Sequence, residues 1–405
     1  MKQKEIIVEK AKGQYLFANN QKYLDFSLSS GTMILGHSNK VFTKTLEKQL
    51  KLGSNFSSNN INQVKYKKFL KKTFTDLKNF EFSSSGSEAN IRALRIARAV
   101  SKKNNFAMVN GSWHGSIDQF MFDYKQKKKL NLKSLEELSL GTGNSKKNLF
   151  MLPYNNIELS RKILKKNLDK ISVVVIEPIQ CGVPNNESIK YLKFLSEYCK
   201  SNKILIWFDE IITGMRVHKL SVFKKYNLKP DIVTFAKCFG GGMPIGITSY
   251  NSNVQKKLKK LKKKVFLGGT FSGNPISTIL GLKTCEYLKK NHLKINRHIN
   301  NLAKTLEEDI NSYCSNNKIS FRLLRYESLL RPIFTEKNIM NKFERNRYDP
   351  MFKNTIKFKN YLLNKNIYLS SNCCFFISYC HDKKNIKKLS TVLKKYLKEN
   401  LLYAK

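Results

Sequence analysis

Short apolar runs alternate with helical patterns through the middle of the chain, and this alternation limits the fold more than any other feature. The runs are almost continuously apolar, as strands of a parallel sheet buried on both faces are. Between two of them, residues 191–202 place Leu192, Leu195 and Cys199 on one helical face. We therefore expect an α/β fold with a mostly parallel sheet covered by helices on both sides. The runs span residues 105–111, 171–178, 203–210, 231–237 and 244–250.

Three charged residues stand where these runs end. Glu177, Asp209 and Lys237 each follow or close an apolar run. Ligands of open α/β sheets bind at the carboxyl ends of the strands. Lys237, in "DIVTFAKCFGGGMPIG", is also followed by glycines that we expect to leave room for a ligand. These three side chains are therefore the first candidates for a functional site.

The length of 405 residues suggests two domains. The last third reads as a small α+β domain, because hairpin-like segments precede a final helical pattern. We expect residues 1–50 to join this small domain, residues 51–295 to form the large domain, and residues 296–405 to complete the small one. Residues 125–147 are polar and are predicted to form a surface excursion that acts as a flap.

Composition excludes several classes of protein. The formal net charge of +46 favours nucleic acid or an anionic membrane at first sight. However, the excess is mostly lysine, accompanied by asparagine and isoleucine, which an A/T-rich genome produces, and aromatic residues are not interleaved with the basic runs. No apolar run is long enough for a membrane span, and the N-terminus lacks the pattern of a signal peptide. The eight cysteines form no Cys-x-x-Cys pair. We therefore expect a cytoplasmic protein without a metal site, a membrane anchor or a specific nucleic-acid partner.

Two loops carry groups that suit a phosphorylated ring. Ser85, Gly86 and Ser87 lead into a helix that is predicted to begin near Ser87, and the N–H groups of a first helical turn bind anions. "GSWHGS" puts Trp113 and His114 between glycines, where they could face a planar ring. Taken alone, each loop is equally well explained as an ordinary N-cap or a turn with a half-buried tryptophan.

The combination is more specific than its parts. A phosphate cradle, a ring-stacking aromatic, a strand-end aspartate and a strand-end lysine together meet the needs of pyridoxal phosphate, which requires an anion site, a carboxylate for its ring nitrogen and a lysine for a Schiff base. "ILIWFDE" also resembles a Walker B strand, but the dipeptide Gly-Lys of Walker A occurs nowhere in the chain. A nucleotide triphosphatase is therefore excluded.

From about residue 16 to 395 the chain resembles the class III aminotransferases, which are fold-type I pyridoxal-phosphate enzymes, and it is most similar to their glutamate-1-semialdehyde aminomutase branch. The resemblance implies a large domain with a seven-stranded, mostly parallel sheet, a small α+β domain built from both chain ends, and a homodimer with shared active sites. The motifs that carry it are "SSGSEANIRALRIAR", "GSWHGSID", "FDEIITGMRV", "KPDIVTFAKCFGGGMPIG" and "GGTFSGNP".

The same resemblance assigns roles by position. Lys237 would be the Schiff-base lysine and proton shuttle, and Asp209 would pair with the ring nitrogen. Ser85, Gly86 and Ser87 would hold the phosphate, Trp113 and Ile211 would cover the two faces of the ring, and Thr270 would reach the phosphate of the neighbouring subunit. Glu177, His114 and Arg331 are further candidates at the site, Arg331 together with Arg216 as a carboxylate binder; both arginines are equally well read as surface or structural residues.

The substrate is left open. The segment "SSNCCFF" has cysteine where this branch carries glutamate, and "EPIQCGVP" lacks the glutamate gate of omega-aminotransferases. Transfer of an amino group between a small-molecule amino donor and an oxo acceptor is the first reading, and an intramolecular 2,1-aminomutase the second. A basic nucleic-acid-binding protein on the same fold, and a catalytically silent relative, are weaker alternatives.

Overall fold

The computed structural model describes residues 4–56, 58–125, 134–349, 352–371 and 373–402. The chain divides into two compact units. Unit 1 consists of Met1–Thr43, Cys181–Asn186 and Asn291–Lys405, and unit 2 of Lys44–Gln180 and Glu187–Lys290. The boundaries between the units follow Thr43 and Lys290, near the predicted domain boundaries at residues 50 and 295. The short segment 181–186 belongs to unit 1. That these units act as the two predicted domains stays a prediction.

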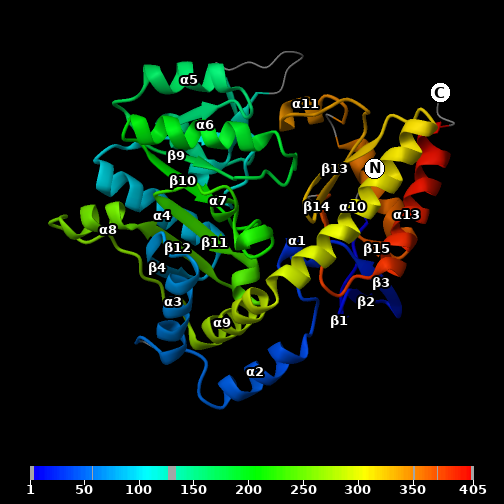
Figure 1. Cartoon of the computed structure of the whole chain (residues 1–405), viewed down its shortest axis with the longest axis horizontal. Helices are drawn as coiled ribbons and strands as arrows, with labels where there is room; N and C mark the ends of the chain where they lie inside the picture. The colour runs from blue at the N-terminus through cyan, green and yellow to red at the C-terminus, as the bar shows by residue number, and fades with distance from the viewer. Residues whose placement is uncertain (1–3, 57, 126–133, 350–351, 372, 403–405) are drawn as a thin grey trace. The chain divides into compact units, whose positions relative to one another are not determined.

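Unit 2 is built on a seven-stranded sheet covered by helices (Figure 1). Its strand order is β4-β12-β11-β10-β9-β5-β8, and β12 alone runs antiparallel to its neighbours β11 and β4. The α/β fold with a mostly parallel sheet is therefore confirmed. The strands are β4 (Leu77–Ser83), β5 (Asn105–Val109), β8 (Leu149–Leu152), β9 (Ile171–Ile176), β10 (Leu205–Asp209), β11 (Ile232–Ala236) and β12 (Gly246–Asn251).

The five apolar runs of the sequence all form strands of this sheet, whereas β4 and β8 had no comparable signal. β4 alternates buried and more exposed side chains, and β8 is only four residues long. The helices of unit 2 are α3 (Ile61–Thr73), α4 (Gly86–Ser101), α5 (Ile157–Lys166), α6 (Ser188–Ser201), α7 (Val222–Lys225), α8 (Ser252–Lys259) and α9 (Pro275–Lys290), with 3-10 turns η1 (Asp118–Phe120), η2 (Gly143–Asn148), η3 (His218–Leu220) and η4 (Lys237–Gly240). Helix α2 (Lys40–Leu50) spans the boundary between the two units, which follows Thr43.

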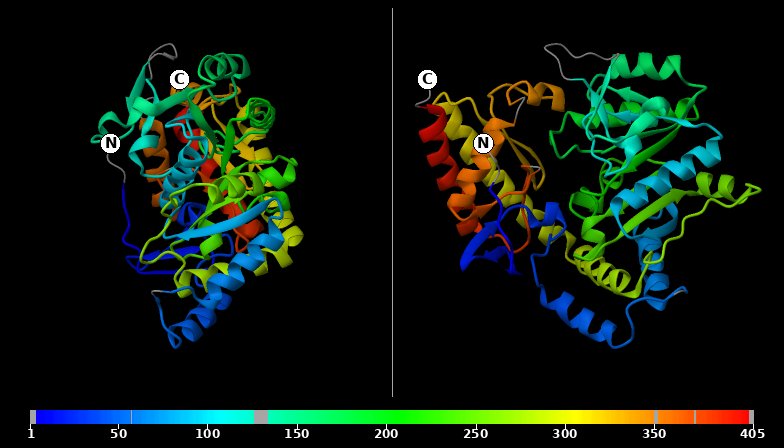
Figure 2. Two further views of the ribbon diagram at one scale, coloured as in Figure 1. Left: turned by 90° about the vertical axis from the view of Figure 1, so that its left-hand side faces the viewer. Right: turned by 180° about the vertical axis from the view of Figure 1, so that it is seen from behind.

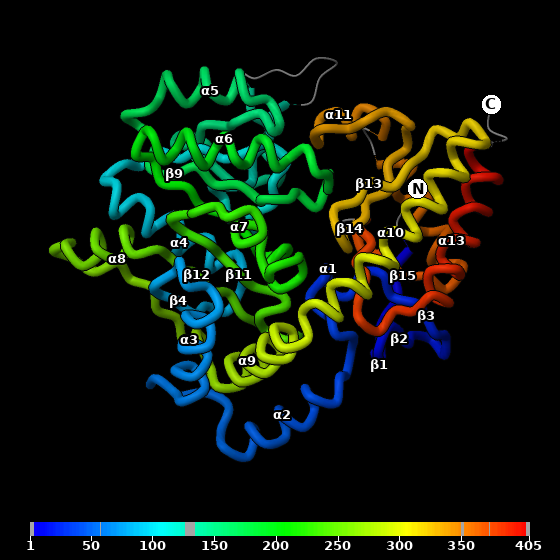
Figure 3. Tube along the Cα trace, in the orientation of Figure 1, coloured from blue at the N-terminus to red at the C-terminus, as the bar shows by residue number. Residues whose placement is uncertain are grey.

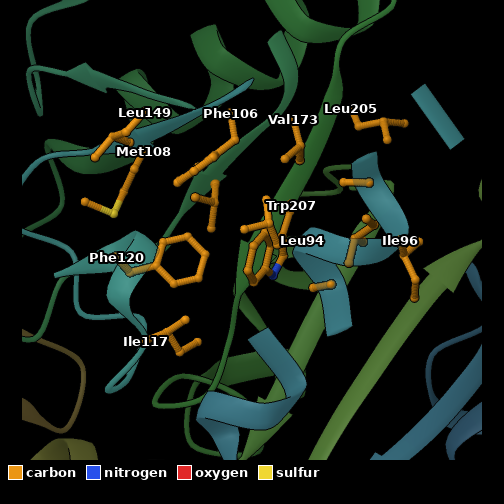
Figure 4. Close-up of a cluster of buried hydrophobic side chains, with 14 of the residues drawn as sticks. Leu94, Ile96, Phe106, Met108, Ile117, Phe120, Leu149, Val173, Leu205 and Trp207 are labelled. Atoms are coloured by element: carbon orange, nitrogen blue, oxygen red, sulfur yellow. The ribbon is translucent and has the colours of Figure 1, made fainter. Parts of the chain in front are cut away.

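The core of unit 2 lies on both faces of the sheet. On one face, Leu94 and Ile96 of α4 pack with Val173 and Trp207 from β9 and β10 (Figure 4). On the other, Phe235 of β11 stacks on Phe74 and Phe239. Burial on both faces is why the sequence of these strands is continuously apolar rather than alternating.

Unit 1 joins the two ends of the chain. Strand β15 (Ile367–Tyr368) pairs parallel with β3 (Gln21–Asp25), so the N-terminal strands lie beside C-terminal elements, blue beside orange and red in Figure 2. The other elements are β1 (Lys10–Lys12), β2 (Tyr15–Ala18), α1 (Leu28–Gly31), the hairpin β13 (Arg322–Tyr326) and β14 (Leu329–Ile333), β16 (Phe375–Phe376), α10 (His292–Asn316), α11 (Lys342–Asn346), α12 (Lys353–Asn364), α13 (Lys383–Leu397) and a terminal π-helical turn η5 (Lys398–Leu402). The long path of α10 is clear in the Cα trace (Figure 3).

The predicted flap is only partly described. Residues 126–133 lie outside the described residues. On either side of them, β6 (Phe122–Tyr124) pairs antiparallel with β7 (Leu135–Glu137), and η2 follows. None of the helices in the described part of the chain combines the length and apolarity needed to cross a membrane.

Candidate active site

The site candidates in unit 2 come from strands whose carboxyl ends share one edge of the sheet. β9, β10 and β11 are parallel neighbours, with Phe208 opposite Ile176 and Asp209 opposite Thr234. Glu177, Asp209 and Lys237 therefore lie along this edge, as the strand-end rule predicts. The loops after β4 and β5 lie at the same edge of the sheet. They carry the Ser85–Ser87 segment and the "GSWHGS" motif.

Asp209 is held by three hydrogen-bond donors. Its Oδ2 accepts from Asn90 Nδ2 at 2.8 Å and lies 2.8 Å from His114 Nδ1, and its Oδ1 accepts from the backbone N–H of Ile211 at 3.1 Å. The side chain is 2% exposed. An ionised carboxylate offers about four acceptor sites, so one remains for a further N–H donor. The arrangement fits a carboxylate that receives a proton-bearing ring nitrogen.

His114 serves Asp209 rather than presenting its face to a ligand. Its ring is buried, tilted against Trp207 and edge-on to Phe120. Because an ionised carboxylate only accepts, the Nδ1–H of His114 must be the donor toward Asp209. Its Nε2 is buried without a hydrogen-bond partner among the described residues. His114 therefore orients Asp209 and fixes its own tautomer in doing so.

The N-terminus of α4 forms an anion cradle. Ser85 is its N-cap, and its Oγ accepts from the N–H of Glu88 at 3.1 Å. The first N–H groups of a helix have no acceptor within it, and the helix dipole favours an anion at that end. Ser87 Oγ accepts from the N–H of Ser116 at 3.2 Å, which ties the cradle to the loop that carries Trp113. The helix begins at Gly86, one residue before the predicted start.

Gly86 is required by its neighbour Ile211. A Cβ at position 86 would lie 2.8 Å from Ile211 Cδ1 and 3.4 Å from the Cβ of Ala236. Ile211 is half-buried and begins the segment that follows Asp209. The absence of a side chain at position 86 therefore lets the isoleucine approach the phosphate cradle.

Trp113 is exposed and fixed at its backbone. Its side chain is 54% exposed, although tryptophan is usually covered, so one face is available to a ligand. Its N–H donates to Glu177 Oε1 at 3.3 Å. Glu177 is buried, and this contact makes it a support for the Trp113 loop. That places Glu177 beside the site in a structural capacity.

Lys237 stands at the end of β11 with an unusual backbone. Its φ of +51° is in the left-handed region, which non-glycine residues rarely adopt and which is enriched at functional sites. The side chain is half-buried. Among the described residues, no carboxylate forms an ion pair with its amine. Lys237 is therefore an amine at the sheet edge that is not committed to a structural salt bridge.

The glycines after Lys237 pack closely against their neighbours. A Cβ on Gly241 would lie 2.2 Å from Thr284 Oγ1, and one on Gly240 would lie 2.9 Å from Ile245 Cγ2. Gly241 also has a φ of +60°. Gly241 is therefore needed for close packing on α9 and for a tight turn, and Gly240 for close packing on Ile245.

Thr270 lies in an exposed segment that α4 anchors. Arg92 Nη2 donates to the carbonyl of Gly268 and to Ser272 Oγ, each at 2.9 Å, and pairs with Glu88. Thr270 itself is exposed. Thr270 is therefore exposed in a segment that is anchored to α4, the helix whose N-terminus forms the anion cradle.

The two arginine candidates are not surface residues. Arg216 is 1% exposed; burial raises the pKa of the nearby Cys238 thiol, and the charge of Arg216 opposes this effect. Arg331 is 7% exposed and belongs to unit 1, where its Nη1 contacts Cys374 Sγ at 3.6 Å. The reading of either as a surface arginine is thus wrong, because both are enclosed.

Three residues of the site carried no signal in the sequence. Asn90 donates to both Asp209 and the carbonyl of His114, the latter at 2.9 Å. Gln180 Nε2 donates to the carbonyl of Asn110 and to Ser112 Oγ, at 2.8 and 3.0 Å, and so supports the loop before Trp113. Arg92 is the third. For Asn90 and Arg92, the available signal is that polar side chains on a core-facing helix need buried hydrogen-bond partners.

Comparison with known proteins identifies the family. Residues 1–335 match the family described as aminotransferase class-III. This chain belongs to that family. A glutamate-1-semialdehyde 2,1-aminomutase of Methanocaldococcus jannaschii is 30% identical, over 94% of this chain and 88% of its own length. The aminotransferase-type enzyme that the sequence predicted is thereby confirmed.

Solved structures share the fold. An omega-transaminase from Sphaerobacter thermophilus has a TM-score of 0.87 at 18% identity, covering 97% of this chain and 91% of that one. A structure described as a transaminase with PLP bound has a TM-score of 0.82 at 20% identity, over 97% and 91% of the two chains. The fold-type I architecture expected for this class III aminotransferase is therefore confirmed.

Proposed function

We propose that this class III aminotransferase transfers an amino group between a small-molecule amino donor and an oxo or aldehyde acceptor, with pyridoxal 5′-phosphate as cofactor. The observation that carries the proposal is Asp209, a buried carboxylate with three donors and room for a fourth, at the same sheet edge as Lys237. A buried carboxylate of this kind is what a protonated pyridine nitrogen needs.

The residues present fit that cofactor. The N–H groups at the start of α4 and the Ser85–Ser87 segment would hold the phosphate. Trp113 and Ile211 would lie against the two faces of the ring, one exposed aromatic and one half-buried aliphatic side chain. When bound, the cofactor supplies an aldehyde that combines with amines and a ring that withdraws electrons from the bonds to the α-carbon.

Lys237 would perform two tasks. Its amine would hold the cofactor covalently in the resting enzyme, which is consistent with the lack of a carboxylate partner among the described residues. Once a substrate amine takes its place, Lys237 Nζ would take the proton from the substrate α-carbon. A positioned base contributes typically about 10²–10⁴-fold to a rate. Asp209, oriented by His114 and Asn90, would keep the ring nitrogen protonated throughout.

A homodimer in the cytoplasm completes the proposal. Thr270 is exposed between two large exposed aromatics, Phe266 at 74% and Phe271 at 61%. Exposed apolar side chains gathered on one segment indicate a surface that another protein covers. A second copy of this chain would cover it and receive Thr270 at its phosphate.

Borohydride trapping tests the role of Lys237. Reduction of the yellow holoenzyme should fix the cofactor to one lysine, and peptide mass spectrometry should locate the adduct at Lys237. In Lys237→Ala the adduct should be absent and turnover should fall by more than about 10⁴-fold, because the base is lost together with the covalent attachment. Lys229→Ala, which removes a surface partner of Asp76, is the control. An adduct at another lysine, or turnover retained in Lys237→Ala, would refute the assignment.

A 2,1-aminomutase is the second candidate. It is favoured by the 30% identity to a glutamate-1-semialdehyde 2,1-aminomutase over nearly the whole chain. A mutase isomerises one substrate without releasing an oxo product, whereas a transaminase releases it and needs an acceptor. Incubation with glutamate 1-semialdehyde alone separates the two, because only the mutase would give continuous turnover with no acceptor present.

A further inference from the structure

Two cysteines from distant parts of the sequence form a close pair in unit 1. Cys181 begins the short segment Cys181–Asn186, and Cys374 immediately precedes β16. Their Sγ atoms are 2.9 Å apart, and both side chains are buried. A disulfide bond measures about 2.05 Å, so a displacement of under about 1 Å would join the two sulfurs.

Positive charge surrounds the Cys374 sulfur. Arg331 of β14 is enclosed, and its Nη1 lies 3.6 Å from Cys374 Sγ. Burial lowers the pKa of the Arg331 guanidinium, but the charge on Cys374 is the largest opposing effect, and the pKa lies above its usual value. Arg345 approaches from α11 and donates to the carbonyl of Gly182 at 3.1 Å. A thiolate at Cys374 thus serves as a counter-ion for Arg331.

The surroundings give Cys374 a lower pKa than the adjacent Cys373. Burial disfavours the thiolate, but the hydrogen bond from Cys181 and the charges of Arg331 and Arg345 outweigh it and lower the pKa of Cys374 to about 7. Burial raises the pKa of the adjacent Cys373 to about 11. In its neutral form Cys374 instead donates its S–H to the carbonyl of Cys181 at 3.1 Å.

Most buried cysteines of this chain have the opposite environment. Burial raises the pKa of Cys199 and Cys285, and Cys285 lies 3.1 Å from the Tyr66 hydroxyl. A thiol becomes reactive through its thiolate and through a nearby resolving thiol, and a buried neutral thiol is inert. Cys374 has the thiolate and, in Cys181, the resolving partner; because both side chains are enclosed, the peroxide must enter the site before it can react.

We propose that Cys181 and Cys374 are a redox-active pair that hydrogen peroxide oxidises to a reversible disulfide. The Cys374 thiolate attacks a peroxide oxygen, the O–O bond breaks, and the departing hydroxide becomes water by taking up a proton, which leaves a sulfenic acid. Cys181 Sγ then attacks Cys374 Sγ, the S–O bond breaks, and the hydroxide that leaves takes the Cys181 proton as a second water. Two electrons pass from the thiols to the peroxide.

Formation of the disulfide has an electrostatic consequence. It removes the thiolate that balances Arg331 and leaves an enclosed guanidinium without that charge, which is costly in a low-dielectric interior. It also ties segment 181–186 to the residues before β16. This segment continues directly from Gln180, which supports the loop before Trp113.

The test is oxidation of the holoenzyme by hydrogen peroxide. After a brief exposure at pH 7, thiols are blocked with N-ethylmaleimide and peptides are mapped without reduction. We expect a linked pair of peptides containing Cys181 and Cys374, the loss of two of the eight thiols, and full reversal by dithiothreitol. Linkage through Cys373, or irreversible oxidation spread over several cysteines, would overturn the proposal.

Matched variants sharpen the result. Cys373→Ser should form the link at the wild-type rate, whereas Cys374→Ser should lose thiols at least about ten-fold more slowly, because it lacks the thiolate. Cys181→Ser should stop at a sulfenic acid, which dimedone traps. In the wild type, the rate of linkage should be half-maximal near pH 7. A rate that rises only above pH 9 would show that Cys374 is not the attacking thiolate, and this reading does not depend on whether a variant folds.

Discussion

At the scale of single residues, two adjacent carboxylates at the end of β10 have different environments. Asp209 faces three hydrogen-bond donors at the edge of the sheet. Glu210 is buried, accepts from the N–H of Phe223 at 3.0 Å, and also pairs with the Thr213 hydroxyl. Burial raises the pKa of Glu210 to about 7, against the opposing effect of these hydrogen bonds. Burial therefore resists ionisation of Glu210.

The raised pKa of Glu210 predicts that the free energy of unfolding falls as pH rises. The raised pKa means that, between pH 4.5 and about 7, the folded chain holds a proton on Glu210 that the unfolded chain has released. Its contribution is complete below pH 4.5 and is lost as pH rises through about 7. It amounts to about 3 kcal/mol, at 1.36 kcal/mol per pKa unit. Glu210→Gln keeps an acceptor and cannot titrate, so its free energy of unfolding, measured in urea, should fall between pH 5 and pH 8 by about 2–3 kcal/mol less than that of the wild type.

The exposed Glu187 offers the control for this measurement. Glu187→Gln removes a surface carboxylate that pairs with Lys190, so its effect on the pH dependence should be below about 0.5 kcal/mol. If Glu210→Gln and Glu187→Gln gave the same pH profile, Glu210 would not be the titrating group.

At the scale of elements, the position of α4 depends on β12. The first residue of β12, Gly246, pairs with Ser83 of β4 just before the anion cradle. A Cβ on Gly246 would lie 1.9 Å from the carbonyl oxygen of Ser85 and 2.7 Å from its carbonyl carbon. Because backbone atoms cannot rotate away, any side chain here displaces the N-cap of α4.

Gly246→Ala should therefore impair phosphate binding as well as folding. We expect a loss of about 1–3 kcal/mol in the free energy of unfolding. The Kd for pyridoxal phosphate, measured by fluorescence titration of the apoenzyme, should rise at least about ten-fold, since the N–H groups of the cradle move out of line.

Gly182→Ala is the comparison, because its Cβ meets only the guanidinium of Arg345, the far end of a flexible side chain, and residue 182 belongs to unit 1. Both quantities should stay near the wild-type values in that variant. Unchanged cofactor affinity in Gly246→Ala would show that β12 does not set the position of the cradle.

At the scale of the whole molecule, the net charge of +46 and the proposed homodimer act against each other. Two copies of a strongly basic chain repel each other at low ionic strength, so association must come from apolar contact. Phe266 and Phe271, exposed on either side of Thr270, supply apolar surface on one segment. We therefore expect dimerisation to strengthen as salt screens the repulsion.

Substitutions in this segment should separate assembly from cofactor binding. Phe271→Asp places a charge in the proposed interface, so sedimentation velocity should shift from dimer to monomer and cofactor affinity should fall with it. Thr270→Val keeps the size of the side chain and removes one hydroxyl. It should leave the dimer intact and weaken cofactor binding by about 1–2 kcal/mol. If Thr270→Val lost cofactor affinity only when the dimer also dissociated, a direct contact between Thr270 and the phosphate would be contradicted.

The sequence by itself determined the class of fold and the strand-end candidates. Apolar runs, a Ser-Gly-Ser turn before a helix and charged residues at strand ends are local patterns, because each reflects the burial of one short segment. Lys237 and Asp209 could be proposed from such patterns. The family resemblance could be read for the same reason, since its motifs are the loops that follow these strands.

Only the tertiary structure decided which polar groups meet. Asn90 and Gln180 resemble ordinary polar residues until the fold brings Asn90 to Asp209 and Gln180 to Ser112. The same holds for Cys181 and Cys374, 193 residues apart, and for Gly241, whose partner is on α9. Contacts across such separations leave no periodicity in either segment, because they arise when whole elements pack. Their geometry therefore exists only in the folded chain.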